Sequence, residues 1–189
     1  MITIWLRELS TYNNGFCFDF EANLDNYSSS NDLLEDLFTY TEEQLNNYEE
    51  KLTDYSPFEE HMIVDYDIGD IDFSYRDFNF SEYESLDKLI KINEQLNELN
   101  TNQLLSIKAL LENDYTFESA LEYIDDILIY EADTMVDFAY YVVEELEYLG
   151  SVPDIVLNYI DYEKVARDLE YDNYREIEYK GNNYIVRVI

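Results

Sequence analysis

The alternation of apolar and polar positions predicts a β-hairpin near the start of the chain. Residues 2–9 form the first expected strand, residues 12–15 (Tyr-Asn-Asn-Gly) a turn, and residues 16–20 the second strand. Cys17, the single cysteine, falls in the second strand, where we expect it to be buried. Apolar residues alternate again over residues 61–68, which predicts a further strand.

Helices are expected after this hairpin and through the middle of the chain. Ser30 and Asn31 can cap a helix to about residue 38, and residues 41–44 (Thr-Glu-Glu-Gln) form a capping-box pattern that opens a second helix to about residue 52. In the middle, apolar residues spaced for one helix face predict further helices. These are a helix over 86–99 capped by Ser85, a second capped by Thr101, and a short third from Thr116 to Tyr123.

The last third of the chain contains the clearest start and stop signals. Asp133 and Thr134 can cap a helix over about 135–149, and Gly150 lies where a C′ glycine ends such a helix. The remaining expected elements are a strand over 127–130, a short helix from Pro153 to Ile160, a helix to Leu169 capped by Asp161, and a hairpin of strands 175–179 and 184–189 around residues 181–183.

These elements predict an α+β protein made of three small domains. We expect an N-terminal α+β domain over residues 1–84, in which helices accompany an antiparallel sheet. A central helical domain follows over residues 85–126, and a C-terminal α+β domain over 127–189 combines helices with a small antiparallel sheet. Only 4 Gly and 2 Pro occur in the sequence, which leaves little room for flexible linkers.

The chain is strongly acidic. Its 189 residues include 44 Asp+Glu and 11 Lys+Arg, which gives a formal net charge of −33. Because 47% of the residues are hydrophobic and 16% aromatic, the chain can nevertheless build a core and is predicted to be folded. Its surface would repel nucleic acid, so direct nucleic-acid binding is excluded. Self-repulsion also favours an elongated arrangement of the domains.

Acidic residues are concentrated in blocks that contain no basic residue. Residues 8–50 carry eleven Asp or Glu and residues 109–163 carry fifteen, in both cases without any Lys or Arg. Residues 164–189 instead carry five acidic and five basic residues. Because like charges repel in a contact, we expect this mixed block near contacts between domains or subunits.

The residues that catalysis requires are scarce. The chain has one His, one Cys and no nucleophile-elbow or phosphate-loop motif, so we expect neither an enzyme nor a cofactor. The segment Asp65–Asp72 is similar to a calcium loop, but the positions that need Gly and Glu hold Asp70 and Arg76. We therefore expect no metal site, and we expect His61 to be structural.

Features of secreted and membrane proteins are missing as well. No segment approaches the roughly 18 uncharged apolar residues of a membrane span, and Arg7 and Glu8 interrupt the apolar stretch at the N-terminus. A single cysteine offers no disulfide framework. We therefore expect a cytoplasmic protein that makes no membrane contact.

The amount and the spacing of the charge resemble those of duplex DNA. Because DNA has two phosphates per base pair, a charge of −33 matches about 16 base pairs, and about twice that number in a homodimer. Carboxylates three or four residues apart on a helix lie about 6 Å apart, comparable to successive phosphates along a strand. A DNA mimic that binds a positively charged partner is therefore predicted. Pairs with this spacing are Asp133/Asp137, Glu118/Glu122, Glu122/Asp126 and Glu144/Glu147.

The C-terminal sequence resembles that of a known family. Residues 138–153 (Phe-Ala-Tyr-Tyr-Val-Val-Glu-Glu-Leu-Glu-Tyr-Leu-Gly-Ser-Val-Pro), followed by Asn-Tyr-Ile-Asp-Tyr at 158–162 and Ala-Arg-Asp-Leu at 166–169, are similar to the C-terminal signature of the ArdA antirestriction proteins. The chain departs from this signature at residues 140–142 and 146–147, and at residue 166, where the family has glycine. These departures leave the expected fold intact and the preferred target open.

The resemblance implies a DNA mimic of three small domains that forms a homodimer through its C-terminal region. Family members occupy the DNA-binding groove of type I restriction-modification enzymes, chiefly the methyltransferase core, and so protect incoming mobile DNA. Three alternatives stay open. One is an acidic adaptor or chaperone that binds a basic protein, another is a DNA mimic directed at another DNA-binding defence enzyme, and the third is a cation-dependent surface protein.

In this interpretation, the partner-binding surface consists of carboxylates that stand in for phosphates. Arg167 and Asp168, in contrast, are expected to have a structural role, in an internal ion pair or a dimer contact. The carboxylates that we expect on this surface are Glu118, Glu122, Asp125, Asp126, Asp133, Asp137, Glu144, Glu145, Glu147, Asp154 and Asp161, with Glu42, Glu43, Glu49 and Glu50 extending it in the N-terminal domain.

Overall fold

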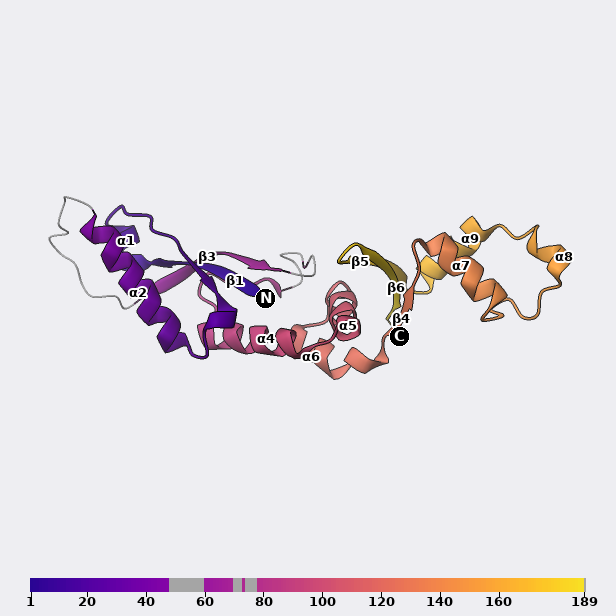
Figure 1. Ribbon diagram of the computed structural model, residues 1–189, viewed down its shortest axis with the longest axis horizontal. Helices are drawn as coiled ribbons and strands as arrows, with labels where there is room; N and C mark the ends of the chain where they lie inside the picture. Colours follow the sequence, from indigo (N-terminus) through magenta and orange to yellow (C-terminus); the bar gives the residue numbers. More distant parts are fainter. Residues whose placement is uncertain (48–59, 70–72, 74–77, 189) are drawn as a thin grey trace. The chain divides into compact units, whose positions relative to one another are not determined.

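The computed structural model describes residues 1–47, 60–69, 73 and 78–188 (Figure 1). These residues form a mixed α+β chain with two antiparallel sheets of three strands each, which confirms the expected fold class. The chain divides into two compact units, here called the N-terminal unit (Met1–Tyr75 with Asn79–Leu99) and the C-terminal unit (Arg76–Phe78 with Asn100–Ile189). The division into three domains stays a prediction.

The N-terminal unit is built on a sheet with the strand order β2-β1-β3. β1 (Ile2–Glu8) is the central strand and pairs antiparallel with both β2 (Phe20–Asn23) and β3 (His61–Ile68). Every second residue of β1 is buried, so one side of the strand faces the core, as the apolar alternation predicted. The predicted strand over 61–68 is confirmed as β3.

The predicted hairpin exists, but its second strand begins later than expected. The short helix α1 (Leu9–Asn13) follows β1 directly, because the buried carboxylate of Glu8 accepts hydrogen bonds from the backbone N–H groups of Ser10 and Thr11 (2.8 and 2.7 Å). This helix takes up part of the expected turn. The expectation that Cys17 is buried in a strand is wrong, because Cys17 precedes β2 and is exposed.

One continuous helix, α2 (Ser30–Asn46), replaces the break predicted in this region. Leu33, Leu37 and Thr41 are buried four residues apart on one face, which packs against the sheet (Figure 1). The Thr41 hydroxyl donates to the carbonyl oxygen of Leu37 (2.8 Å), so Thr41 lies inside the helix and caps nothing. Packing therefore overrides the local capping-box pattern. The end of the predicted second helix lies outside the described residues.

α4 (Leu86–Glu98) completes the core of the N-terminal unit and has the predicted serine N-cap. Its apolar stripe is buried, and it packs against the 3-10 helix η1 (Leu24–Asn26). The buried side chain of Asn93 accepts a hydrogen bond from the backbone N–H of Ile2 (2.7 Å) and donates one to Asp25 (2.9 Å). This single amide therefore ties α4 to both β1 and η1.

The C-terminal unit begins with helices. α5 (Thr101–Leu111) is capped by Asn100 through a capping box, so the prediction of Thr101 as its cap is wrong by one residue. α6 (Phe117–Glu122) begins one residue after the predicted start at Thr116, which is its N-cap, and leads into the 3-10 helix η2 (Ile124–Asp126). α5 contacts α6, η2 and all three strands of the unit, which explains why most of its residues are buried.

The C-terminal sheet has the strand order β4-β6-β5. β4 (Leu128–Glu131) and β5 (Tyr174–Tyr179) both pair antiparallel with β6 (Asn182–Arg187). β5 and β6 form the predicted hairpin, with a turn one residue earlier than expected, at Lys180 and Gly181. Both turn residues have a positive φ (50° and 78°), which is the conformation of a two-residue type I′ turn.

α7 (Met135–Glu144) and α9 (Tyr162–Tyr171) pack against each other around an apolar core. The N-caps of both helices are the predicted ones. The expected continuation of α7 to residue 149 is wrong. A longer helix would place three glutamates near its negative C-terminal end, and Leu146 and Leu149 are exposed, so burial does not offset that cost.

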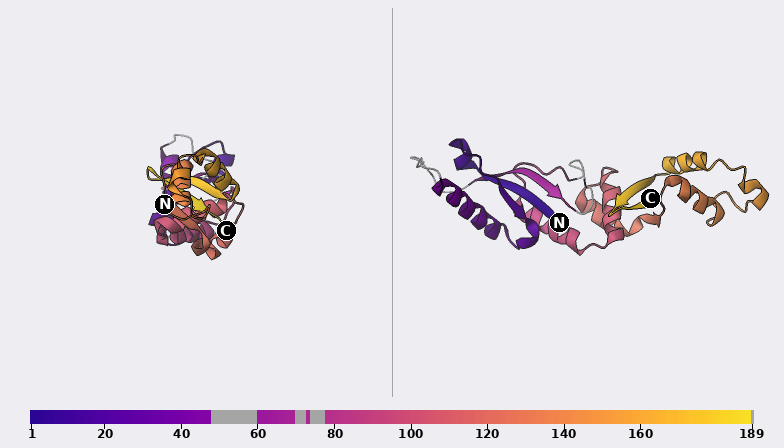
Figure 2. Two further views of the ribbon diagram at one scale, coloured as in Figure 1. Left: turned by 90° about the vertical axis from the view of Figure 1, so that its right-hand side faces the viewer. Right: turned by 45° about the horizontal axis from the view of Figure 1, so that its top comes forward.

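A loop with little buried surface connects α7 to α9. It contains α8 (Asp154–Leu157), the short helix predicted here, which ends three residues before the predicted end at Ile160. None of the residues of α8 is buried. The right view of Figure 2 shows α8 at the far end of this loop, away from the strands of its unit. The loop therefore projects exposed apolar residues from the C-terminal unit.

Candidate functional site

Nearly all of the carboxylates that the structure describes lie on the surface. Among the described residues, every Asp and Glu is exposed except Glu8 and Glu84. Glu49 and Glu50 lie outside the described residues, and all the other carboxylates expected on the partner-binding surface are exposed. The block over 109–163, which has no Lys or Arg, is described throughout, and each of its fifteen acidic residues is exposed. Lys108 and Lys164, which lie just outside the block, pair with Glu112 (3.8 Å) and Asp161 (3.0 Å). Because no Lys or Arg lies within the block, most of its negative charge is unopposed.

One group of these carboxylates lies on α6 and η2. Glu118 and Glu122 are four residues apart on α6, and Asp125 and Asp126 belong to η2. They face solvent because the apolar side of α6, around Phe117, is buried. Of the four pairs predicted from spacing, only Glu118/Glu122 falls within a single helix, because every other pair extends past a helix end.

A second group lies at the N-terminal end of α7. Thr134 caps the helix by accepting a hydrogen bond from the backbone N–H of Asp137 (3.1 Å), and its hydroxyl donates to the carboxylate of Asp137 (2.6 Å). Asp133 precedes the cap, and its carbonyl oxygen accepts a hydrogen bond from Asn183 of β6 (2.8 Å). Both carboxylates lie near the positive end of the helix dipole, which stabilises them without removing their charge.

A third group lies where α7 ends. Glu144 is the last residue of the helix, Glu145 is its C-cap, and Glu147 follows with a φ of 49°. Tyr162 of α9 donates its hydroxyl hydrogen to the carboxylate of Glu144 (3.0 Å). The orientation of Glu144 is therefore set by a contact between two helices, and the helical spacing predicted for Glu144 and Glu147 is absent.

Asp154 and Asp161 differ in how much of their charge remains free. Asp161 caps α9 by accepting from the backbone N–H of Lys164 (3.2 Å), and it also pairs with the Lys164 ammonium group (3.0 Å). The hydrogen bond from Lys164 lowers the pKa of Asp161 below its ordinary value. Asp154, the first residue of α8, is exposed and carries its charge on the projecting loop. Asp161 consequently offers less net charge to a partner than Asp154.

In the N-terminal unit, Glu42 and Glu43 lie on the solvent side of α2. The opposite side of the helix contains the buried residues Leu37 and Thr41. The spacing of that buried face turns both carboxylates outward. The backbone of both residues is therefore positioned by a helix that packs against the sheet.

Asp172 is an exposed carboxylate that residue patterns did not place on the partner-binding surface. It is the C-cap of α9 and accepts a hydrogen bond from the hydroxyl of Tyr148 (2.8 Å). These two residues are 24 positions apart, so no local pattern connects them. The sequence contains many Tyr residues close to Asp and Glu, which indicates that tyrosine–carboxylate hydrogen bonds can form. It does not show which Tyr bonds to which carboxylate.

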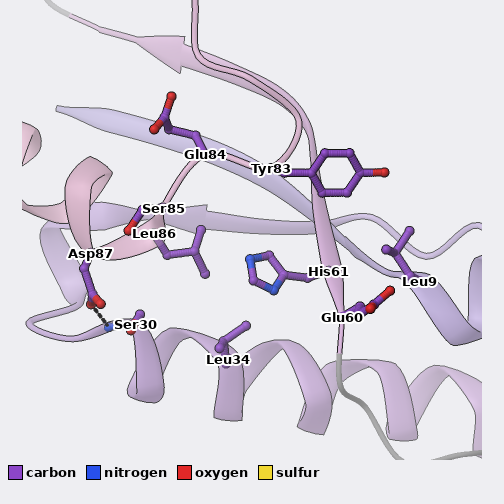
Figure 3. Close-up of a pocket in the computed structure, with 10 residues that line it drawn as sticks. All are labelled: Leu9, Ser30, Leu34, Glu60, His61, Tyr83, Glu84, Ser85, Leu86 and Asp87. Carbon is purple, nitrogen blue, oxygen red and sulfur yellow. Dashed lines mark hydrogen bonds between the residues drawn. The ribbon is translucent and has the colours of Figure 1, made fainter.

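A pocket of about 510 Å³ lies in the N-terminal unit, where α2, β3 and the start of α4 approach one another (Figure 3). The imidazole of His61 points into it, and burial lowers the pKa of His61 below its ordinary value. In Figure 3 the carboxylates of Glu84 and Asp87 point away from His61. Asp87 instead accepts from the backbone N–H of Ser30 (3.1 Å) and Glu84 pairs with Lys88 (3.3 Å), so both stabilise helix ends.

The described ranges contain no metal site. Within them, no group of three or more His, Cys, Asp or Glu is arranged to hold a metal ion. Asp70 and Asp72 of the calcium-like segment lie outside those ranges. None of the helices that the structure describes has the length and apolar character needed to cross a membrane.

Comparison with known proteins identifies the family. The model of the antirestriction protein family ArdA matches residues 4–181, which is almost the whole chain and far more than the C-terminal signature. A separate comparison with curated proteins gave no match. The family match agrees with the exposed, unopposed carboxylates described above. The chain therefore belongs to the ArdA family of antirestriction proteins, which are DNA mimics without enzymatic activity that inhibit type I restriction enzymes.

Proposed function

We propose that the chain occupies the DNA-binding groove of a type I restriction-modification enzyme, chiefly its methyltransferase core, with its carboxylates in the places of DNA phosphates. The observation that carries this proposal is the block over 109–163, where fifteen exposed acidic residues occur without any Lys or Arg. A DNA-binding groove is lined with basic residues. Such a groove gains affinity from many charge contacts, each of them weak.

The proposed surface consists of the predicted carboxylates, to which we add Asp172. Those of these side chains that the structure describes are exposed, and several lie on α2, α6, α7 and α8, which supports this assignment. Because helices hold most of them, little conformational entropy is lost when the partner binds. A flexible polyanion with the same charge would lose more. Rigid placement of the charges thus favours a folded mimic over an acidic tail.

We also propose that the chain forms a homodimer through its C-terminal region and is organised as three small domains in an elongated arrangement. Support for the dimer comes from a set of exposed apolar side chains here called the loop surface. Burying such side chains against a second copy would remove them from water. A dimer would carry charge equivalent to about 33 base pairs, a length suited to a large enzyme. The loop surface consists of Leu146, Leu149, Ile155, Val156 and Tyr159, which are 44–85% exposed.

Displacement of DNA tests the proposed function. The purified chain is titrated into a complex of a type I methyltransferase core with a fluorescent duplex, at low salt, where charge contacts are strongest. We expect stoichiometric release of the duplex, and weaker release as salt is raised. If the duplex stays bound at low salt while the chain still binds an unrelated basic protein, the acidic adaptor is the better interpretation.

A further inference from the structure

Three carboxylates in the described residues are held by tyrosine hydroxyl groups. The pairs are Tyr27–Asp36 (2.9 Å), Tyr148–Asp172 (2.8 Å) and Tyr162–Glu144 (3.0 Å). All three carboxylates are exposed. Each bond connects residues at least nine positions apart, so each depends on the tertiary fold.

A tyrosine hydroxyl and a basic side chain hold a carboxylate with different consequences. Arg7 pairs with Asp19 at 2.6 Å, and Lys164 pairs with Asp161 at 3.0 Å, so each of these carboxylates lies beside a compensating positive charge. A hydroxyl donates a hydrogen bond but carries no net charge. It therefore fixes the orientation of the carboxylate and leaves its negative charge available to a partner.

The geometry around Tyr162 shows how firmly its hydroxyl is held. Tyr162 is only 8% exposed, and its ring stacks on that of Tyr140 of α7 (3.7 Å between ring centroids, 21° between ring planes). The hydroxyl projects from this stack to Glu144, at the exposed end of α7. A ring fixed by its neighbours thus fixes a surface carboxylate that would otherwise sample several rotamers.

Tyr148 acts on Asp172, at the opposite end of α9 from Tyr162. It follows the end of α7, where its backbone N–H donates to the carbonyl oxygen of Val142 (3.0 Å). Its hydroxyl donates to Asp172, the C-cap of α9. Both ends of α9 therefore take part in a contact between a tyrosine and a carboxylate.

The hydroxyl groups keep their protons over the physiological range. Burial, together with the hydrogen bond to Glu144, raises the pKa of Tyr162. The hydrogen bond to Asp172 raises the pKa of Tyr148. Ionisation of either tyrosine would place two negative charges side by side, so the donor form is maintained.

We propose that Tyr162 and Tyr148 are positioning residues of the anionic surface, which hold Glu144 and Asp172 in the orientation that receives basic side chains of the partner enzyme without neutralising them. This inference rests on the proposed function and deepens it. It separates carboxylates that a hydroxyl group orients, with no ion pair among the described residues, from those, such as Asp161, that pair with a cationic side chain. Glu144 is the clearer case, because Arg187 donates a hydrogen bond to the backbone carbonyl oxygen of Asp172 (3.3 Å). It also gives a reason for tyrosine, and not phenylalanine, at these two positions.

The test is a double-mutant cycle in the DNA-displacement assay. Tyr162→Phe keeps the ring stack and the net charge but removes the donor, and we expect displacement to require about three to ten times more protein. In a Glu144→Gln background, the same Tyr162→Phe change should have no further effect. In a Glu145→Gln background it should retain its full effect, because the carboxylate of Glu145 has no hydroxyl partner among the described residues. Tyr141→Phe, which removes a hydroxyl that holds no carboxylate in those residues, should match the wild type.

Two results would overturn the inference while leaving the proposed function intact. One is a Tyr162→Phe variant that displaces DNA as well as the wild type, and the other is an equal loss in the presence and absence of Glu144. The Tyr148→Phe and Asp172→Asn cycle repeats the test at a more exposed tyrosine, where the fold depends less on the ring. Failure of the wild-type chain itself to displace DNA would overturn the proposed function, and this inference with it.

Discussion

Asn93 of α4 donates a hydrogen bond to Asp25 of η1 across 2.9 Å, while its side-chain oxygen accepts one from the backbone N–H of Ile2 at 2.7 Å. Asn93 is almost completely buried, whereas Asp25 is exposed. Through this amide the first strand, the 3-10 helix and α4 are joined by hydrogen bonds to one buried side chain. α2, which carries Glu42 and Glu43, packs against β1 and α4, so the contacts of Asn93 help to position this helix.

Removing the amide should destabilise the N-terminal unit. Asn93→Ala leaves the buried N–H of Ile2 without its acceptor, which costs about 1–3 kcal/mol for the unsatisfied group alone. We expect a loss of that size in the free energy of unfolding by urea, followed by the fluorescence of Trp5 in β1. Asn97→Ala is the matched control, because the exposed side chain of Asn97 donates to Asp25 (2.7 Å) and, among the described residues, to no backbone group. Equal losses in the two variants would contradict the role assigned to Asn93.

Asp25 should make stability depend on acid pH. Burial by itself would raise its pKa, but hydrogen bonds from the N-terminal ammonium group, Asn93 and Asn97 outweigh this effect and lower the pKa to about 2 from an ordinary 3.8. The folded state then holds the proton less tightly than the unfolded state. The stabilisation is therefore fully present above about pH 5 and is lost as pH falls from about 4 through 2.

The comparison of the wild type with Asp25→Asn isolates this effect from the many other carboxylates. The difference in unfolding free energy between the two proteins should be constant near neutral pH and should shrink between about pH 4 and pH 2. Chemical denaturation at a series of pH values measures it. A difference that stays constant down to pH 2 would show that Asp25 titrates with its ordinary pKa.

Unpaired carboxylates should contribute more to inhibition than paired ones. Glu118→Gln with Glu122→Gln removes two unopposed charges from α6, and at about 0.2–1 kcal/mol per exposed ion pair the double variant should lose about 0.4–2 kcal/mol of binding to the restriction enzyme. The loss should be larger at low salt. Inhibition constants measured at several salt concentrations test both expectations.

Asp19→Asn is the matched control for these charge removals. Its carboxylate already pairs with Arg7 at 2.6 Å, so the substitution changes the net charge without removing an unopposed negative charge. We expect less loss of inhibition per charge than in the α6 variant. If inhibition falls equally for every charge removed, only net charge matters and the assignment of particular surrogates is wrong.

The loop surface should control the oligomeric state. Ile155 is 76% exposed on α8, and an Ile155→Asp substitution would place a charge in the proposed dimer contact. We expect the variant to be monomeric by light scattering after size-exclusion chromatography at concentrations where the wild type is a dimer. Tyr171→Asp serves as the control, because Tyr171 is 86% exposed on α9 but lies outside the loop surface. A dimer that survives Ile155→Asp would place the contact elsewhere.

The carboxylates of α6 and α7 show which features of the proposed surface the sequence patterns could predict. Glu118 and Glu122 were predicted on the partner-binding surface from their four-residue spacing, and both are exposed on α6, whose residues Phe117 and Ala120 are buried. The carboxylates around the end of α7 were predicted to be exposed, and they are, but their spacing was not predicted correctly. That spacing depends on where α7 ends. Glutamates near the negative end of the helix dipole disfavour a longer helix, and the exposed Leu146 adds no burial to offset that cost.

The sequence alone was sufficient to predict features in which the interacting residues lie within a few positions of each other. The caps at Ser85 and Thr134 were predicted because the capping oxygen and the N–H it accepts from are three positions apart. The acidity, the family signature and the two antiparallel hairpins are features of the same kind, and they were enough to indicate a folded DNA mimic.

Packing was needed wherever a residue acts on a distant one. The burial of Thr41 against the sheet made α2 continuous, and the contact between α7 and α9 brought the Tyr162 hydroxyl to Glu144, 18 positions away. The same residue type can be neutralised by lysine, held by tyrosine or left free, as Asp161, Asp172 and Asp154 show. The state of each carboxylate depends on which donor the fold places within hydrogen-bonding distance. Residues that are close in the fold can be far apart in the sequence, so the sequence alone does not identify that donor.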